Sequence, residues 1–253
     1  MIYDLQKASM WKRVSAWLFD TILLSIVAVG FAFLLSTILG YDKYNDRLQT
    51  AYDRYESEYG ISFDITEEDY LALDPTQKEV YDKAYTALSE DGEALYAYNM
   101  VIYLTLIILS VGILLAYLLL EFVIPLFLKN GQTLGKKIFG ICLMRNDGVR
   151  LPTLSLLVRT LLGKYTVETM VPVLILVMIF FNFLGLAGTL TILGLLILQI
   201  VVLAVTKTNS AIHDLLAGTV VVDMASQMIF ENEEAMLEYK KKIAAEAAAK
   251  TDY

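Results

Sequence analysis

The feature that most constrains this chain is a set of long apolar runs, the first of which extends over about 26 residues from Val14 to Leu39. A helix of that length is roughly 39 Å long, enough to cross the hydrocarbon core of a bilayer with some tilt. The run is nearly twice as long as the apolar core of a signal peptide, so we expect it to be retained. Since 57% of the chain is hydrophobic and the apolar residues are gathered in blocks, the sequence indicates an integral membrane protein.

Three further apolar runs complete the set. Met100–Leu128 predicts a second span, interrupted by Glu121 and kinked or ended near Pro125. Val167–Leu186 and Leu190–Val205 are separated by three residues and predict a transmembrane hairpin, because about 39 residues are too many for one crossing. Four spans place both chain ends on the same side of the membrane.

Charge is divided unevenly between the connecting segments. Residues 129–164 contain seven Lys or Arg and one Asp, a balance of +6, whereas residues 41–97 contain fifteen Asp or Glu and five Lys or Arg, a balance of −10. Loops rich in Lys and Arg stay on the cytoplasmic side. The sequence therefore predicts a bacterial inner-membrane protein with both termini cytoplasmic and an acidic segment outside. We expect no nucleic-acid partner.

The acidic segment carries helix signals of its own. Apolar residues repeat at helical spacing from Tyr44 until Gly60, and Asp74-Pro75-Thr76-Gln77 predicts an N-cap, a first-turn proline and a capping box for a helix through Leu88. Ten of the sixteen tyrosines lie between residues 41 and 98. Two interpretations remain open: a solvated helical extension of the first two spans, or an outer surface that binds a protein partner or attracts cations.

The cytoplasmic loop predicts a small β element. Asn146-Asp147-Gly148 is a tight-turn signal between Ile141–Arg145 and Val149–Leu151, which predicts a hairpin. Thr219–Asp223 is a further strand candidate that can pair with it. Within the same loop, Thr153 is expected to cap a surface helix over residues 154–164, with Arg159 on its polar face.

Ionisable residues inside or beside the spans are the candidate functional residues. Asp20 lies roughly 9 Å inside the first run, where a charge costs on the order of 2.5–3.5 kcal/mol. Glu121 lies at a similar depth in the second. Arg13 is too far from Asp20 for an ion pair, but Asp214 follows the last span by about nine residues, which predicts a charge-assisted Arg13–Asp214 hydrogen bond near the same boundary.

Two roles for these charges remain open. In one, Asp20, together with Glu121 or Asn182, forms a polar pocket that binds a cation or a proton. In the other, Arg13, Asp20 and Asp214 form a polar clamp that orients the helices without any ligand.

Other patterns point to less. His213 beside Asp214 is either a proton relay or a structural hydrogen-bond donor. The segment GQTLGKK at residues 131–137 has the wrong spacing for a phosphate loop, so its glycines are expected to serve close turns. One cysteine and one histidine give no disulfide framework and no metal site, and no nucleophile has a recognisable base. We expect neither a cofactor nor an enzymatic activity.

Three segments in this order resemble the RDD family of multi-pass bacterial membrane proteins: WKRVSAWLFDTILL from residue 11, GQTLGKKIFGICLMRNDG from residue 131 and HDLLAGTVVV from residue 213. The resemblance implies that Arg13, Asp20 and Asp214 are signature polar residues. It also implies transport of an unidentified ligand, with monovalent cation/proton exchange attributed to some members. Residues 41–97 look like an insertion larger than the usual first loop of the family.

The sequence therefore predicts an all-α integral membrane protein with four transmembrane helices, an extracytoplasmic helical insertion and a small cytoplasmic β element. Its expected function is transport or exchange of a small solute, with Asp20 and Glu121 as binding residues, and four spans suggest that a homo-oligomer forms the pathway. The alternative is a membrane scaffold or accessory subunit whose outer segment binds a partner. The expected segments are 1–40, first span; 41–99, outer insertion; 100–128, second span; 129–166, basic loop; 167–205, transmembrane hairpin; 206–226, HDLLAGT segment and strand; and 227–253, a charged helical tail.

Overall fold

The computed structural model describes residues 5–180 and 183–251. Within them, four helices are long and apolar enough to cross a membrane: Met10–Leu39, Gly92–Phe127, Thr153–Phe180 and Gly185–Val205. This confirms the prediction of four spans. The chain forms two compact units, Met1–Ala28 with Ile113–Tyr253, and Val29–Gly112.

The second span is one continuous helix made of three parts: α5 (Gly92–Tyr117), the π-helical turn η1 (Leu118–Val123) and α6 (Ile124–Phe127). It begins before the predicted start because the Asp91 carboxylate accepts the backbone N–H groups of Glu93 and Ala94. Pro125 lies near its end, as predicted. Proline has no N–H to donate to the carbonyl four residues earlier, and that carbonyl, of Glu121, instead accepts the Thr160 hydroxyl at 3.0 Å.

The third span begins earlier than the sequence suggested. α8 (Thr153–Val158), the π-helical segment η3 (Arg159–Met170) and α9 (Val171–Phe180) form one helix, so the separate surface helix and the boundary predicted at residue 166 are wrong. The polar stretch continues into the span because its charged side chains have buried partners. Its N-cap is Pro152, and the Thr153 side chain makes no capping bond.

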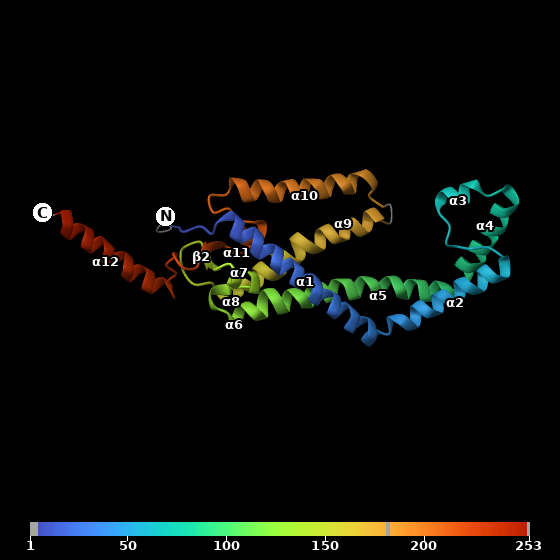
Figure 1. Ribbon diagram of the computed structural model, residues 1–253, viewed down its shortest axis with the longest axis horizontal. Coiled ribbons are helices and arrows are strands. Elements are labelled where there is room, and N and C mark those ends of the chain that lie inside the picture. Colours follow the sequence, from blue (N-terminus) through green and yellow to red (C-terminus); the bar gives the residue numbers. More distant parts are fainter. Residues whose placement is uncertain (1–4, 181–182, 252–253) are drawn as a thin grey trace. The chain divides into compact units, whose positions relative to one another are not determined.

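The fourth span, α10 (Gly185–Val205), lies beside α9, as Figure 1 shows. α9 ends at Phe180 and α10 begins at Gly185, so residues 187–189, which were predicted to connect the two spans, lie within α10. Asn182, proposed as a pocket residue, lies outside the described residues.

Short elements connect the spans in the larger unit: η2 (Lys129–Gly131), α7 (Leu134–Ile138), β1 (Ile141–Arg145), α11 (Ile212–Ala217) and β2 (Thr219–Asp223). β1 and β2 pair antiparallel, with Ile141 opposite Asp223 and Arg145 opposite Thr219. The predicted turn at residues 146–148 is present, since the Gly148 N–H donates to the Arg145 carbonyl at 3.0 Å.

The predicted hairpin strand over residues 149–151 does not form. Val149 instead makes an isolated parallel bridge to Phe230. The strand β2 pairs with β1, and its valines are buried on both faces of the pair: Val220 and Val222 pack with Cys142 and Met144, and Val221 packs in the core that contains Ile141 and Leu143. The tail helix is confirmed as α12 (Glu233–Thr251).

The smaller unit contains α2 (Tyr41–Tyr59), α3 (Glu67–Ala72) and α4 (Pro75–Glu90). Both end signals are confirmed, since Gly60 follows α2 in the left-handed conformation and the Asp74 capping box begins α4. α2, α4 and the beginning of α5 share a core of Ala51, Leu88 and Ala94 with aromatic neighbours. The short helix α3 was not predicted. Its capping box begins at Thr66, but six residues are too few to show an apolar repeat.

Candidate functional site

Asp214 is the most heavily bonded carboxylate of the larger unit. It lies in the first turn of α11 and is fully buried. Its Oδ1 accepts Arg159 Nε at 3.2 Å and Nη2 at 2.9 Å, while its Oδ2 accepts Arg13 Nη2 at 3.4 Å. Burial by itself would raise the pKa of Asp214, but the positive charges of Arg159 and Arg13 outweigh burial and hold that pKa below its usual range. The predicted Arg13–Asp214 contact is confirmed.

His213 joins this group to the half-buried carboxylate of Glu168. Its Nδ1 lies 2.7 Å from Glu168 Oε2, its backbone N–H donates to Glu168 Oε1 at 3.1 Å, and its Nε2 lies 3.7 Å from Asp214 Oδ1. Burial, with the charge of Arg159, lowers the pKa of His213, so the ring is neutral at pH 7. A neutral ring that donates from Nδ1 to Glu168 is a structural hydrogen-bond donor in this arrangement. A relay function for His213 stays a prediction.

A glycine allows this arrangement. A Cβ atom on Gly163 would lie 2.4 Å from His213 Cβ and 2.7 Å from its Cα. Because no side chain fits between them, η3 and α11 approach each other closely here.

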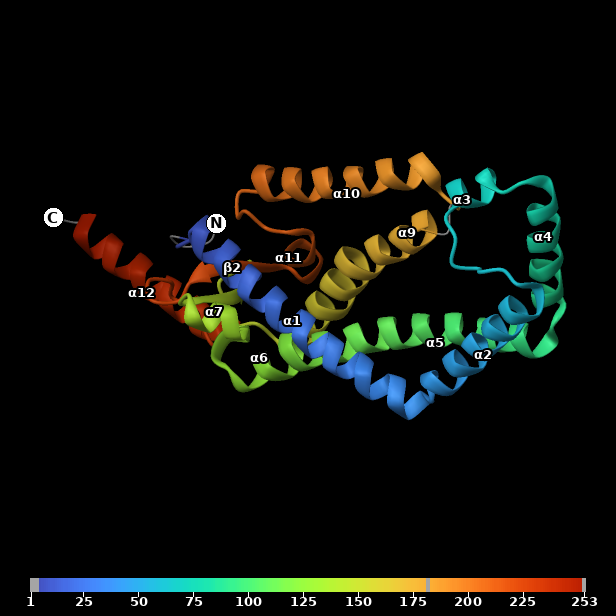
Figure 2. The same ribbon diagram turned by 45° about the vertical axis from the view of Figure 1, so that its right-hand side comes forward.

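Asp20 is held by the segment that follows the second span. Its Oδ2 accepts the Thr133 hydroxyl at 2.5 Å and its Oδ1 accepts the Gly135 N–H at 2.8 Å, which fixes the beginning of α7 against α1 (Figure 2). A Cβ atom on Gly135 would lie 2.4 Å from the Ala16 carbonyl oxygen. Gly135 therefore serves a close approach of α7 to the backbone of α1, whereas the sequence predicted a turn at this glycine.

Glu121 lies in η1 and is 5% exposed. Its Oε1 accepts Lys164 Nζ at 2.5 Å, and its Oε2 has no hydrogen-bond partner among the described residues. No direct bond joins Glu121 to Asp20 in the described part of the chain. The shared pocket of Asp20 and Glu121 stays a prediction, and the charges of both carboxylates act on Lys136.

Lys136 is a buried base that interacts electrostatically with both carboxylates. It is 7% exposed, and its Nζ donates to Thr133 Oγ1 at 3.2 Å. Burial lowers the pKa of Lys136 to about 8, while Glu121 and Asp20 act in the opposite direction. The sequence analysis treated this lysine only as part of a basic loop.

The main partners missed by the sequence analysis come from one helix. Arg159, Lys164 and Glu168 belong to η3, where π-helical winding takes more residues per turn than an α-helix. In an α-helix, residues five apart point about 140° away from each other, so Arg159 and Lys164 look unrelated. In a π-helix, residues five apart lie almost above one another. One sequence signal could have indicated these ion pairs: the predicted helix over residues 154–164 contains two bases, Arg159 and Lys164, and bases buried in a membrane protein need acidic partners.

The network of buried and partly buried charged side chains is balanced in charge. It contains four acids and four bases, with His213 neutral: Asp20, Glu121, Glu168 and Asp214 against Arg13, Lys136, Arg159 and Lys164. Such balance is expected, because an unpaired charge in this environment is costly.

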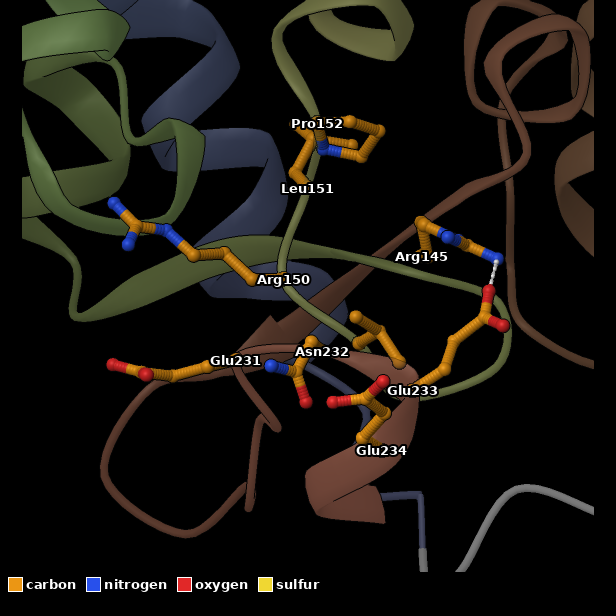
Figure 3. A pocket seen from close by; sticks show the side chains of 9 residues that line it. Arg145, Arg150, Leu151, Pro152, Glu231, Asn232, Glu233 and Glu234 are labelled. Carbon is orange, nitrogen blue, oxygen red and sulfur yellow. Dashed lines mark hydrogen bonds and ion pairs between the residues drawn. The ribbon is translucent and has the colours of Figure 1, made fainter. Parts of the chain in front are cut away.

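A separate groove of about 620 Å³ lies between residues 145–152 and the beginning of α12 (Figure 3). Arg145 Nη2 lies 3.0 Å from Glu233 Oε1 at its edge. None of the predicted site residues lines it. Among the described residues there is also no group of three or more His, Cys, Asp or Glu that could hold a metal ion.

Four apolar helices and a buried, charge-balanced network of side chains define a multi-pass integral membrane protein. The model of the RDD family matches residues 7–218, and the chain belongs to the RDD family. The matched range includes Arg13, Asp20 and Asp214, the residues expected from the sequence to be signature polar residues. A search of curated proteins and a search of solved structures each found no match.

Proposed function

We propose that this RDD family protein exchanges a monovalent cation for protons across the membrane, and that Glu121 is the carboxylate that binds the cation. One observation carries the proposal: Glu121 is buried in an apolar helix, yet its Oε2 has no partner among the described residues. Buried carboxylate oxygens are costly when left unbonded, and such an atom marks a place for a ligand. The π-helical turn around it supports the same assignment, since π-turns are frequent at functional sites.

The other carboxylates of the network have different roles. Both oxygens of Asp20 accept a hydrogen bond, from Thr133 and from Gly135, so Asp20 fixes α7 and contributes negative charge to the cation site from a distance. Both oxygens of Asp214 are bonded as well. We assign the role of polar clamp to Arg13, Arg159 and Asp214, so that Arg159 replaces Asp20 in the clamp expected from the sequence.

We further propose an inner-membrane location with both termini cytoplasmic and residues 41–97 outside. The support is the charge balance of the segments, +6 for residues 129–164 and −10 for residues 41–97. A homo-oligomer is the expected working unit, because four helices enclose a narrow pathway. We expect no enzymatic activity.

The test is a flux measurement in vesicles that contain the purified protein and a pH indicator. Pulses of Na⁺, K⁺ or Li⁺ should drive proton movement in wild-type vesicles, and Glu121→Gln should reduce it by at least about tenfold, because loss of one charge at a desolvated site costs more than about 1.4 kcal/mol. Glu93→Gln is the matched control, since Glu93 lies on the same helix but is exposed. Wild-type flux no greater than that of empty vesicles would remove the proposal.

A second function, a membrane scaffold that recruits a partner, is favoured by the outer helices. They have a core of their own, and they expose large apolar side chains such as Leu71 at 64% and Tyr85 at 60%. Replacing residues 43–89 with a short linker separates the functions. A scaffold should lose a co-purifying partner after this change, whereas a transporter should keep its cation-dependent proton flux.

A further inference from the structure

We propose that Lys136 is the proton-carrying group of the exchange: its ammonium group supplies the positive charge beside Glu121 and Asp20, and a monovalent cation takes Glu121 Oε2 when that ammonium group loses its proton. This inference rests on the proposed cation site at Glu121. It assigns the release of a proton on cation binding to Lys136, a residue outside the apolar helices.

Lys136 is the base of the network that is held least firmly. Arg13, Arg159 and Lys164 each bond directly to a carboxylate, at 3.4, 2.9 and 2.5 Å. Lys136, by contrast, forms no ion pair with a described residue. Its ammonium group donates a hydrogen bond to the Thr133 hydroxyl at 3.2 Å. A proton can leave this amine without breaking an ion pair.

The surroundings of Lys136 suit an exchangeable proton. Glu121 and Asp20 favour its charged form, whereas burial and the charges of Lys164 and Arg159 oppose it. Because burial is the largest effect, the pKa of Lys136 falls to about 8, and a cell near neutral pH can load and unload this amine. The Thr133 hydroxyl donates to Asp20 and accepts from Lys136, so it links the amine to the second carboxylate.

Charge balance gives the stoichiometry. With both lysines charged, Asp20, Glu121, Lys136 and Lys164 sum to zero; with Lys136 neutral, they sum to −1. One monovalent cation restores neutrality, whereas a divalent cation would leave an excess of +1. The exchange is Lys136–NH₃⁺ plus M⁺ giving Lys136–NH₂ with bound M⁺ and H⁺, and the released proton goes to water.

The experiment uses the purified full-length protein in detergent, in weak buffer. NaCl, KCl or LiCl is added against choline chloride at equal ionic strength, while released protons and bound cation are measured. The wild type should release up to one proton per bound cation. Its cation affinity should rise about tenfold per pH unit below pH 8 and level off above it, since one proton is displaced.

Three variants sharpen the result. Lys136→Met should bind the cation with an affinity independent of pH and release no proton. Lys136→Arg keeps a permanent charge and should abolish cation binding. Lys137→Met, on the exposed neighbour, should behave as the wild type.

The inference is overturned if Lys136→Met keeps the wild-type pH slope and proton release, or if the wild type binds no cation at any pH. If vesicles show cation-driven proton flux but the cation affinity of Lys136→Met keeps the wild-type pH dependence, the exchange function is supported and Lys136 is not its proton carrier. Cation binding without flux would keep the site and remove transport. If Lys136→Met does not fold, the inference is still tested by the pH dependence of cation affinity in the wild type and by the loss of cation binding in Lys136→Arg.

Discussion

Replacing Asp214 with asparagine should be among the most destabilising single changes in the larger unit. The side chain is fully buried, and its two oxygens accept bonds from Arg159, Arg13, the Ala211 N–H at 3.1 Å and the Thr219 hydroxyl at 3.2 Å. An asparagine of the same shape keeps one acceptor oxygen and turns an NH₂ group toward at least two donors. It also leaves the 2% exposed Arg159 without a counter-charge.

The magnitude follows from the loss of a buried ion pair, which costs about 3–5 kcal/mol when one partner is removed. For a chain of this size, each kcal/mol lowers the melting temperature by about 2–4 °C, so the expected decrease is about 6–20 °C. The matched control is Asp223→Asn, which breaks the 2.5 Å contact with Lys12, a side chain that is 44% exposed. An exposed pair of this kind contributes less than about 1 kcal/mol.

The assay is thermal unfolding of the purified variants in one detergent, followed by size-exclusion of the heated samples. The reasoning predicts a clear order: wild type, then Asp223→Asn slightly lower, then Asp214→Asn far lower. A melting temperature for Asp214→Asn within about 2 °C of the wild type would show that the Arg13–Asp214–Arg159 group does not hold the fold together.

Three further outcomes are expected. Gly163→Ala should destabilise the protein by about 1–3 kcal/mol because the new Cβ meets His213, whereas Gly194→Ala, with open space around it, should cost little in the same melting assay. Burial lowers the folded-state pKa of His213 below 6.5, so its stabilising contribution is complete above pH 6.5 and is lost as the pH falls. The melting temperature of the wild type should therefore decrease between about pH 6.5 and 5, and that of His213→Asn should decrease less. Since the single native cysteine is buried, Ser89→Cys in intact cells should react with a membrane-impermeant maleimide, and Ser226→Cys should react only after permeabilisation; the reverse pattern would invert the proposed topology.

The sequence predicted the parts of the fold that depend on local patterns. The lengths of the apolar runs predicted four spans, and the residues Gly60 and Asp74 predicted the end of one helix and the beginning of another in the smaller unit. The Arg13–Asp214 contact was also predictable, because both residues lie near ends of spans that share one side.

The buried positions of η3 were not predicted, because the sequence was interpreted with the 3.6-residue repeat of an α-helix and η3 is π-helical. Arg159 and Lys164 were assigned to a surface helix, yet both are buried in a π-helical segment and bond to Asp214 and Glu121. The pairing of β1 with β2 agrees with the prediction that Thr219–Asp223 can pair with Ile141–Arg145, whereas the hairpin strand predicted over residues 149–151 does not form. The buried partners of Arg159 and Lys164 are far away in the chain, and a single sequence does not display them.

The central claim is that Glu121 binds a cation that is exchanged for protons. Its most direct test is cation-driven proton movement in vesicles with wild-type protein and with Glu121→Gln, both verified as folded by their melting temperatures. The account predicts proton movement on addition of Na⁺, K⁺ or Li⁺ that depends on the wild-type carboxylate and is lost in the folded variant. Equal proton movement in the two proteins would contradict the assignment of Glu121.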